Sequence, residues 1–270
     1  MKNLFVTSFD REMFAATGAV LIVSFLDLVS EGTLLICHEG FGSTALFRPP
    51  HISARPRLLE YDLRHAALLR QWLADNRDII PQHLGGTAGI CACPEPSNPF
   101  GPHRSGCHWQ WFNKNASRWF RKVVSLDYAL EVHGFDSVVW VDSDCRFKTR
   151  LPESEVDRWF GGRSVFYLKS PDRHVMESGI LGLRTTAEGR RFVQATVERY
   201  RSGAFRQDLR WDDAYQFQKA LETHPEIDSV DLAWCATGVR PFGDVVPNSP
   251  LGEYLVHRKG FHGSKLGLMR

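Results

Sequence analysis

The amino-acid sequence predicts one α/β domain in which helices flank a parallel sheet. Apolar runs of strand type alternate along the chain with segments of helical periodicity, and this order favours parallel pairing. The run at residues 138–141 is apolar without interruption, as expected of a central strand that is covered on both faces. With 270 residues, of which 43% are hydrophobic and 24% charged, the composition is that of a globular chain. We find neither an internal repeat nor a linker that would divide the chain.

The N-terminal part predicts a strand, a helix and a second strand. Residues 4–7 form a short apolar run typical of a strand. Asp10 is in a position to cap a helix, which we expect to continue to about residue 30. Residues 33–37 are another apolar run and predict the next strand. A second helix is expected at residues 58–73.

The remaining chain begins with an irregular part. Residues 81–108 are rich in glycine and proline and predict a long loop. Helical spacing returns at Trp119, and Gly134 is placed to end that helix before the buried strand. The later expected elements are strands at 165–168, 180–183 and 230–234 and helices at 187–200 and 212–221. Residues 252–270 combine basic side chains with glycines and predict a mobile tail.

Charge and cysteine content exclude several classes of protein. The net charge is only +2, which is too small for a protein that coats nucleic acid. The longest uncharged stretch near the N-terminus has 14 residues, fewer than the roughly 20 that cross a bilayer. Asp10 and Arg11 stand where a secretory signal would be apolar. Six cysteines are too few for a disulfide framework in this chain, so we expect a cytoplasmic protein with free thiols.

The sharpest candidate site is Asp142, Ser143 and Asp144, directly after the apolar strand that ends at Val141. In open α/β sheets, ligands bind at the carboxyl ends of strands. Two carboxylates there are suited to Mg²⁺ or Mn²⁺, which would bridge the phosphates of a nucleotide. The alternative is a solvated turn, because Asp is a common turn residue. The preceding strand favours the metal site.

Three cations crowd the start of the helix that feeds this strand, namely Arg118, Arg121 and Lys122. The helix dipole disfavours positive charge at this end. An anion near the two Asp residues, contacted by Arg121 or Lys122, would explain why cations stand at this unfavourable end of the helix. The alternative is that all three cations are solvated, because surface electrostatics are weak and screened.

Around these residues the sequence resembles the GT-A glycosyltransferases, which move a sugar from a nucleotide sugar to an acceptor. The segment from Trp119 to Val123 is similar to the basic helix of that family, and Asp142 to Asp144 to its Asp-x-Asp motif. The resemblance implies a Rossmann-like fold of GT-A type, with a central mixed, mostly parallel sheet flanked by helices. It implies Mn²⁺ or Mg²⁺ as the cofactor, bound by Asp142 and Asp144. The residues implied to contact the donor here are Arg121, Lys122 and Ser143.

Other segments are similar to the retaining branch that includes glycogenin and galactosyltransferases. Glu177, Ser178 and Gly179 resemble its Asn-x-Gly segment at the sugar pocket, with Glu in place of Asn. Asp212 and Asp213 resemble the acidic helix start that reaches the transferred sugar. The catalytic residues implied by these similarities are Asp213, Asp212 and Glu177.

The two ends of the chain carry further similarities to that branch. In the tail, His257 is similar to the histidine that completes the metal shell, and Lys259 and Lys265 to the lysine that holds the diphosphate. The spacing of these lysines departs from the family form. At the N-terminus, the resemblance places Thr7, Ser8 and Phe9 at the base and ribose of the donor, and core packing is the alternative for Phe9.

The resemblance implies sugar transfer from a nucleoside diphosphate sugar, expected to be a uridine diphosphate sugar, to a glycan, a natural product or a protein. A divalent ion and a cationic side chain would stabilise the charge on the departing diphosphate. Retention of configuration is favoured, while Asp212 or Asp213 as a general base would allow inversion. Two alternatives stay open. One is a non-catalytic nucleotide-sugar or carbohydrate-binding module, and the other is a metal-dependent phosphohydrolase whose first motif Asp is the nucleophile.

The irregular loop holds a second group of potential ligands. Cys91, Cys93 and Cys107 lie there with His103 and His108 nearby. Their spacing lacks the Cys-x-x-Cys pairs typical of zinc sites. Metal binding and a loop that receives the acceptor therefore both stay open.

Overall fold

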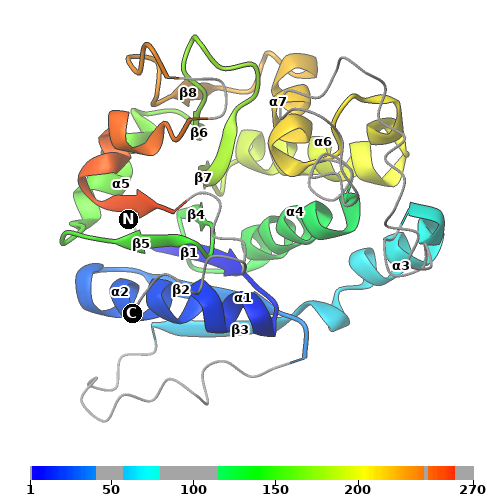
Figure 1. The fold of residues 1–270 in the computed structure, drawn as a ribbon, viewed down its shortest axis with the longest axis horizontal. Helices are drawn as coiled ribbons and strands as arrows, with labels where there is room; N and C mark the ends of the chain where they lie inside the picture. The colour runs from blue at the N-terminus through cyan, green and yellow to red at the C-terminus, as the bar shows by residue number, and fades with distance from the viewer. Residues whose placement is uncertain (1, 41–56, 80–114, 240–242, 259–270) are drawn as a thin grey trace, which may run out of the picture.

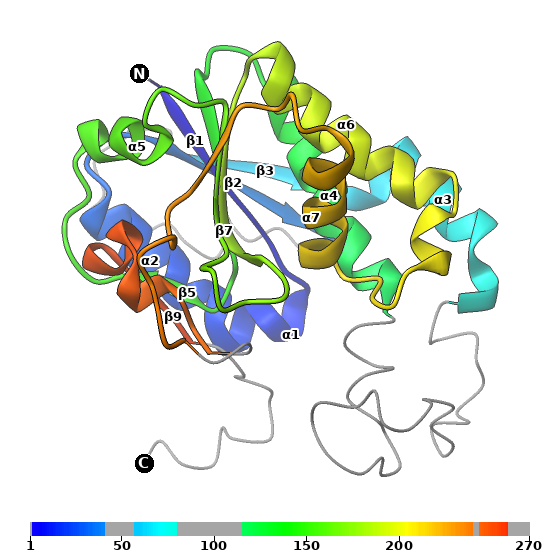
Figure 2. The same cartoon turned by 90° about the horizontal axis from the view of Figure 1, so that it is seen from above.

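The computed structural model of the protein describes residues 2–40, 57–79, 115–239 and 243–258. Within these ranges, seven strands form one sheet in the order β3-β2-β1-β4-β7-β6-β8, and a separate small sheet pairs β5 with β9 (Figure 1). Helices cover the large sheet on both faces (Figure 2). The predicted α/β class, with a mixed, mostly parallel sheet flanked by helices, is confirmed. That the chain forms a single domain stays a prediction.

The strands of the large sheet are β1 (Asn3–Ser8), β2 (Thr33–His38), β3 (Leu58–Asp62), β4 (Ser137–Val141), β6 (Val165–Leu168), β7 (Glu177–Arg184) and β8 (Ser229–Asp231). They lie close to the expected positions except for β3, which was expected as part of a helix, and β8, which is shorter than expected. Neighbours from β3 to β4 are parallel, β7 is antiparallel to both β4 and β6, and β8 is parallel to β6. The small sheet pairs β5 (Cys145–Phe147) antiparallel to β9 (Leu255–His257). All five residues of β4 are buried, as its uninterrupted apolar run predicts.

The α-helices lie in two layers. They are α1 (Arg11–Met13), α2 (Ala19–Leu28), α3 (Ala67–Asp75), α4 (Ala116–Glu131), α5 (Glu153–Phe160), α6 (Ala187–Arg201) and α7 (Asp213–Thr223). Figure 2 shows α3, α4, α6 and α7 on one side of the sheet and α2 and α5 on the other. Short 3₁₀ turns lie at Leu63–His65, Arg77–Ile79, Ala204–Gln207, Val246–Asn248 and Pro250–Glu253.

The pleat of the central strands sorts the core into two clusters. In β4, Val138 and Trp140 pack toward α4, whereas Val139 and Val141 pack toward α2 and α5. This alternation arises because successive side chains of a strand point to opposite faces. A polar residue that follows β4 on the Trp140 side therefore faces α4.

The helix predicted after Asp10 is confirmed. The carboxylate of Asp10 accepts a hydrogen bond from the backbone N–H of Met13 at 2.7 Å, which caps the first turn. A π-helical turn, Phe14–Gly18, joins α1 to α2, so the helical backbone is continuous up to Leu28.

The prediction of one helix at 58–73 is wrong for its first part. Residues 58–62 form β3, the edge strand that pairs with β2, and only the later residues form α3. The side chains of β3 have strand periodicity, since Leu58 packs on one core cluster and Leu59 and Tyr61 pack on the other. Pairing with β2 thus determines the backbone, and the helical spacing applies only after Leu63.

The C-terminal part also differs from the prediction. The strand expected at 230–234 is shorter, and Trp234 beyond it is 68% exposed. Three elements were not predicted: β5, α5 and β9. Of the segment 252–270, Leu255 and His257 are buried in β9; that this segment forms a mobile tail stays a prediction. Residues 259–270 lie outside the described ranges.

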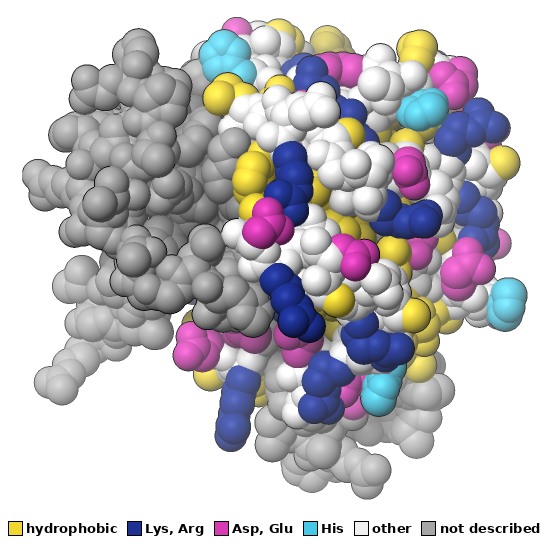
Figure 3. Space-filling view, turned by 90° about the vertical axis from the view of Figure 1, so that its right-hand side faces the viewer, with side chains coloured by type: hydrophobic (Ala, Val, Ile, Leu, Met, Phe, Trp, Pro, Cys, Tyr) yellow, Lys and Arg dark blue, Asp and Glu magenta, His cyan; other side chains and the backbone are white. Residues whose placement is uncertain are grey.

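No helix within the described ranges is long and apolar enough to span a membrane. The cytoplasmic location stays a prediction. On the face shown in Figure 3, basic and acidic side chains of the described residues are interspersed.

Candidate active site

The Asp-x-Asp segment lies in a tight turn between β4 and β5, at the carboxyl end of the central strand. The backbone N–H of Asp142 donates to the carbonyl of Gly179 on β7 at 2.8 Å, and the N–H of Cys145 donates to the carbonyl of Asp142 at 2.9 Å. These bonds fix the turn to two strands of the sheet. The two carboxylates leave it in different directions, and each meets its own set of partners.

Asp142 faces α4, on the side of the sheet that Trp140 also occupies. Its Oδ1 accepts a hydrogen bond from the indole Nε1 of Trp140 at 2.6 Å and lies 2.8 Å from Nζ of Lys122. The Lys122 ammonium also lies over the Trp140 ring, 5.0 Å from its centroid. One carboxylate oxygen of Asp142 is thus held by two side chains, and its other oxygen is oriented by them.

Lys122 is buried, and its ammonium joins two carboxylates. Nζ lies 2.6 Å from Oδ2 of Asp213, the first residue of α7, and donates to the carbonyl of Ser178 at 3.0 Å. Burial by itself lowers the pKa of Lys122, but the carboxylates of Asp142 and Asp213 outweigh it and raise the pKa above its usual range. Burial raises the pKa of Asp213 despite the lysine beside it. The cation predicted to contact an anion therefore contacts two carboxylates of the protein.

Asp144 faces the small sheet and meets His257. In the antiparallel pair of β5 and β9, Cys145 lies directly opposite His257. This register places Nε2 of His257 3.3 Å from Oδ1 of Asp144, and the N–H of Arg258 donates to the Asp144 carbonyl at 3.1 Å. Two residues more than one hundred positions apart in sequence are thus in contact. The metal-binding role that the resemblance implies for His257 stays a prediction.

The donor set here fits a divalent transition metal. Ligand atoms of Asp144, Cys145 and His257 lie within 4.8 Å of one another. Carboxylate oxygens suit hard dications, whereas imidazole and thiolate suit transition metals, so the three side chains could hold a divalent ion. Burial lowers the pKa of His257, but hydrogen bonding to the carboxylates of Asp144 and Asp244 raises it to about 10. A bound dication would take the place of that proton.

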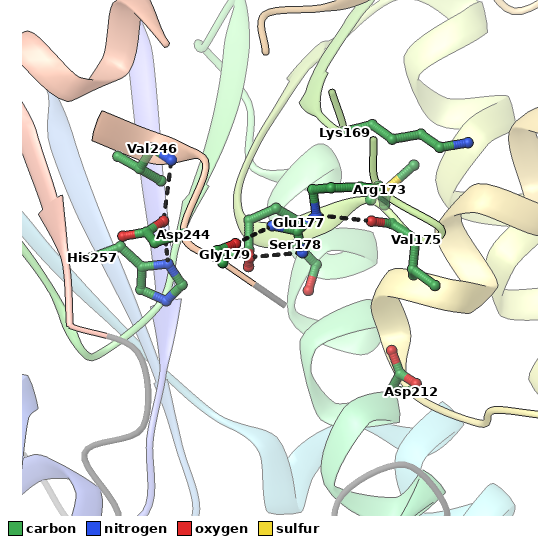
Figure 4. A network of polar contacts seen from close by, with 12 residues as sticks. Lys169, Arg173, Val175, Glu177, Ser178, Gly179, Asp212, Asp244, Val246 and His257 are labelled. Carbon is green, nitrogen blue, oxygen red and sulfur yellow. Dashed lines mark hydrogen bonds and ion pairs between the residues drawn. The ribbon is translucent and has the colours of Figure 1, made fainter. Parts of the chain in front are cut away.

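Glu177 and Gly179 lie at the start of β7, beside His257. The Glu177 carboxylate is buried, accepts a hydrogen bond from the N–H of Gly179 at 3.0 Å and pairs with Arg173 at 3.4 Å (Figure 4). A Cβ at position 179 would lie 2.7 Å from Cε1 of His257. Only glycine leaves room for the imidazole at this distance.

The two acids at the start of α7 are held differently. Asp213 pairs with Lys122, as described above. Asp212 is the N-cap of α7, where its Oδ1 accepts from the N–H of Tyr215 at 3.3 Å, and Arg210 donates two hydrogen bonds to it, at 2.7 and 2.9 Å. In Figure 4, Asp212 lies apart from the network around Glu177.

The remaining predicted donor contacts are spread over β1, α4 and the turn. Thr7 is fully buried in β1, and Phe9 is buried beside Phe14, with 5.5 Å between the ring centroids, as expected for core packing. Arg121 forms an ion pair with Glu39 and hydrogen bonds to the Ser117 carbonyl. Ser143 is buried, and its hydroxyl accepts from Thr17 at 3.4 Å.

The other predicted donor contacts lie at the end of β1 or outside the described residues. Ser8 is half-buried at the end of β1. The lysines of the tail, Lys259 and Lys265, lie outside the described residues, and so do the loop cysteines Cys91, Cys93 and Cys107. Their predicted roles stay predictions.

Two charged residues at this site were missed by the sequence reasoning. Asp244 lies 3.6 Å from Nδ1 of His257, measured from its Oδ1. Arg173 connects Glu177 to the segment that carries Asp244, through a hydrogen bond to the Gly243 carbonyl at 2.6 Å. Neither residue belongs to a motif, and only the folded chain brings them to the site.

Comparison with known proteins supports the fold. The sequence matches no family model and no curated protein. A solved structure, mouse xyloside xylosyltransferase 1 in its apo form, is similar with a TM-score of 0.52 and 14% sequence identity, over 87% of each chain. Identity this low shows a shared fold alone and leaves the reaction to be argued from the site.

Proposed function

We propose that the protein is a metal-dependent glycosyltransferase that uses a nucleoside diphosphate sugar. The observation that carries this proposal is the contact between Asp144 and His257, which lies beside Asp142 at the carboxyl end of β4. The fold is shared with a glycosyltransferase, which supports the same reading. Ligands bind at this edge of open α/β sheets. Mn²⁺ is the proposed ion, held by Asp142, Asp144 and His257, and it would neutralise the charge of the diphosphate.

The protein's own residues define the rest of the reaction. Lys122 holds Asp142 and Asp213 side by side at the strand end, because its ammonium lies within ion-pair distance of both carboxylates. Asp213 is the proposed contact to the transferred sugar, and Glu177 with its Arg173 partner would shape the neighbouring wall. The proposed donor is a uridine diphosphate sugar, with Thr7, Ser8 and Phe9 near the nucleoside and Arg121, Ser143, Lys259 and Lys265 toward the diphosphate.

Retention of configuration is the proposed outcome. Inversion needs a carboxylate that takes a proton from the acceptor hydroxyl. The two acids proposed to be near the sugar are each bound to a cation, Asp213 to Lys122 and Asp212 to Arg210. The cation beside each carboxylate competes with an acceptor hydroxyl for its oxygens, which supports retention.

The first experiment is a thermal-shift screen of nucleoside diphosphate sugars with and without Mn²⁺. A ligand that binds only the folded state raises the unfolding temperature. We expect stabilisation by at least one uridine diphosphate sugar, and only when Mn²⁺ is present. If no nucleotide sugar stabilises the protein with Mn²⁺, the proposal is wrong.

The second experiment separates the alternatives by their products. The stabilising donor is incubated with Mn²⁺ and a panel of glycans, natural products and peptides. A glycosyltransferase releases nucleoside diphosphate in step with a glycosylated acceptor. A phosphohydrolase would release inorganic phosphate or a sugar phosphate without any acceptor. A binding module would show the thermal shift and no product.

A further inference from the structure

The imidazole of His257 lies between two carboxylates, one for each ring nitrogen. Nε2 lies 3.3 Å from Oδ1 of Asp144, and Nδ1 lies 3.6 Å from Oδ1 of Asp244. The ring is buried, with its side chain 4% exposed, so these neighbours rather than water determine its orientation. Figure 4 shows Asp244 directly above the ring, on a segment that precedes β9.

Asp244 is itself fixed by the backbone around it. Its Oδ1 accepts a hydrogen bond from the N–H of Val246 at 3.1 Å, so the carboxylate is turned back along its own chain and toward the histidine. The preceding carbonyl, that of Gly243, accepts a hydrogen bond from Nη1 of Arg173 at 2.6 Å. The position of Asp244 thus depends on a buried guanidinium from a different part of the chain.

Arg173 has two further contacts besides the one to the Gly243 carbonyl. Nε donates to the Val175 carbonyl at 3.2 Å, and Nη2 pairs with Oε2 of Glu177 at 3.4 Å. The other Glu177 oxygen accepts from the N–H of Gly179, the residue whose missing side chain makes room for the imidazole. A connected set of contacts therefore leads from β7 through Arg173 to Asp244 and His257.

We propose that Asp244 is a positioning residue for the metal ligand His257, and that Arg173 anchors it. A histidine that binds metal through one nitrogen commonly donates the N–H of the other to a carboxylate, which fixes the tautomer and the ring direction. Here Oδ1 of Asp244 lies 3.6 Å from Nδ1 of His257, an arrangement that favours a proton on Nδ1 and leaves the lone pair of Nε2 beside Asp144. Glu177 stands where the resembling family has an Asn that lines the sugar pocket. Its carboxylate helps to position Asp244 and His257 through Arg173. This inference rests on the proposed metal site.

The test measures Mn²⁺ binding and not turnover. The full-length protein is titrated with Mn²⁺ in the presence of uridine diphosphate, and free Mn²⁺ is followed by electron paramagnetic resonance. Electron spin echo modulation from ¹⁴N reports whether imidazole is bound to Mn²⁺. We expect this modulation in the wild type and its loss in His257→Ala. In Asp244→Asn, we expect about 10-fold or greater loss of Mn²⁺ affinity and an altered ¹⁴N signal.

Three further variants make the result specific. Asp244→Glu keeps the charge and should recover part of the affinity. Arg173→Lys cannot make all three contacts and should weaken Mn²⁺ binding without touching the ligands. Asp228→Asn removes an exposed carboxylate that pairs with Arg163 and should change nothing. Thermal unfolding of each metal-free variant verifies that it is folded.

The outcomes distinguish this inference from the proposed function. If the wild type binds no Mn²⁺ with the nucleotide, the metal site itself is wrong, and the inference falls with it. If the wild type binds Mn²⁺ with a ¹⁴N signal, but Asp244→Asn has the same affinity and the same signal, only the positioning role is overturned. Should Asp244→Asn not fold, Arg173→Lys decides in the same way.

Discussion

Lys122 on α4 and Asp213 at the start of α7 form a buried ion pair, with 2.6 Å between Nζ and Oδ2. The same ammonium lies 2.8 Å from Asp142, which places a single cation between a proposed metal ligand and a proposed sugar contact. Burial and the nearby charge of Asp142 raise the pKa of Asp213, and the ammonium of Lys122 opposes both effects. The ion pair therefore contributes to the stability of the fold and also holds Asp142 and Asp213 in place at the candidate site.

The first prediction concerns the removal of this cation. Lys122→Met leaves Asp142 and Asp213 without their partner in a buried place, and we expect the free energy of unfolding to fall by about 3–5 kcal/mol. Urea denaturation of the metal-free protein measures it. Lys219→Met, which breaks an exposed pair with Glu222, is the control and should cost at most about 1 kcal/mol. Equal costs for the two variants would contradict the structural role given to Lys122.

The second prediction separates the two acids of α7. Asp213→Asn should lower kcat far more than it weakens donor binding, because its carboxylate is proposed to act on the sugar and not on the metal. Asp212→Asn keeps a good N-cap residue and loses the ion pair with Arg210, so it should cost about 1–3 kcal/mol of stability and lower kcat less than Asp213→Asn does. Steady-state kinetics and urea denaturation of both variants check this. If donor binding and kcat fall equally in Asp213→Asn, the residue belongs to the binding shell.

The third prediction compares the two acids of the Asp-x-Asp segment. Both Asp142→Asn and Asp144→Asn should abolish Mn²⁺-dependent binding of uridine diphosphate, because a neutral amide is a weaker ligand for a hard dication. Asp142→Asn should be the less stable of the two variants, since Asp142 pairs with the buried Lys122 and Asp144 does not. Isothermal titration with and without Mn²⁺ measures binding, with Asp78→Asn at an exposed pair as the control. If both variants still bind uridine diphosphate in a Mn²⁺-dependent way with undiminished affinity, the proposal that Asp142 and Asp144 hold a metal is wrong.

Much of this site was predictable, because strand ends can be read from local sequence. The uninterrupted apolar run of β4 located Asp142 and Asp144, and the pleat then directs Asp142 toward α4, where Lys122 lies. Local signals also existed for α5, since Pro152 precedes two acidic residues of its first turn and Gly161 ends it with φ of 54°.

Other parts of the structure had no local signal. The strand β9 has only three residues, and β3 has a sequence that also fits a helix. Both are determined by pairing with distant strands, which single-sequence periodicity does not contain. Asp244 and Arg173 reach the site for the same reason, through hydrogen bonds between segments about 70 residues apart.

The last prediction tests how closely the backbone of β7 approaches the imidazole. In Gly179→Ala the new methyl would lie 2.7 Å from Cε1 and 3.1 Å from Nε2 of His257, and the backbone hydrogen bond between Gly179 and Asp142 resists a shift of the strand. The ring must therefore move, and we expect Mn²⁺ affinity in the presence of uridine diphosphate to fall about as far as in His257→Ala. Overpacking should also cost about 1–3 kcal/mol of stability.

A double variant identifies the cause of these losses. In Gly179→Ala combined with His257→Ala, the added methyl meets the space that the imidazole leaves. The stability lost in Gly179→Ala should then be largely regained, and Mn²⁺ affinity should be no lower than in His257→Ala alone, because residues in contact do not act additively. Urea denaturation and titration of the four proteins of this cycle provide the comparison. If the two stability changes simply add, the methyl does not act through His257, and the close approach of Gly179 to the proposed metal ligand has no functional consequence.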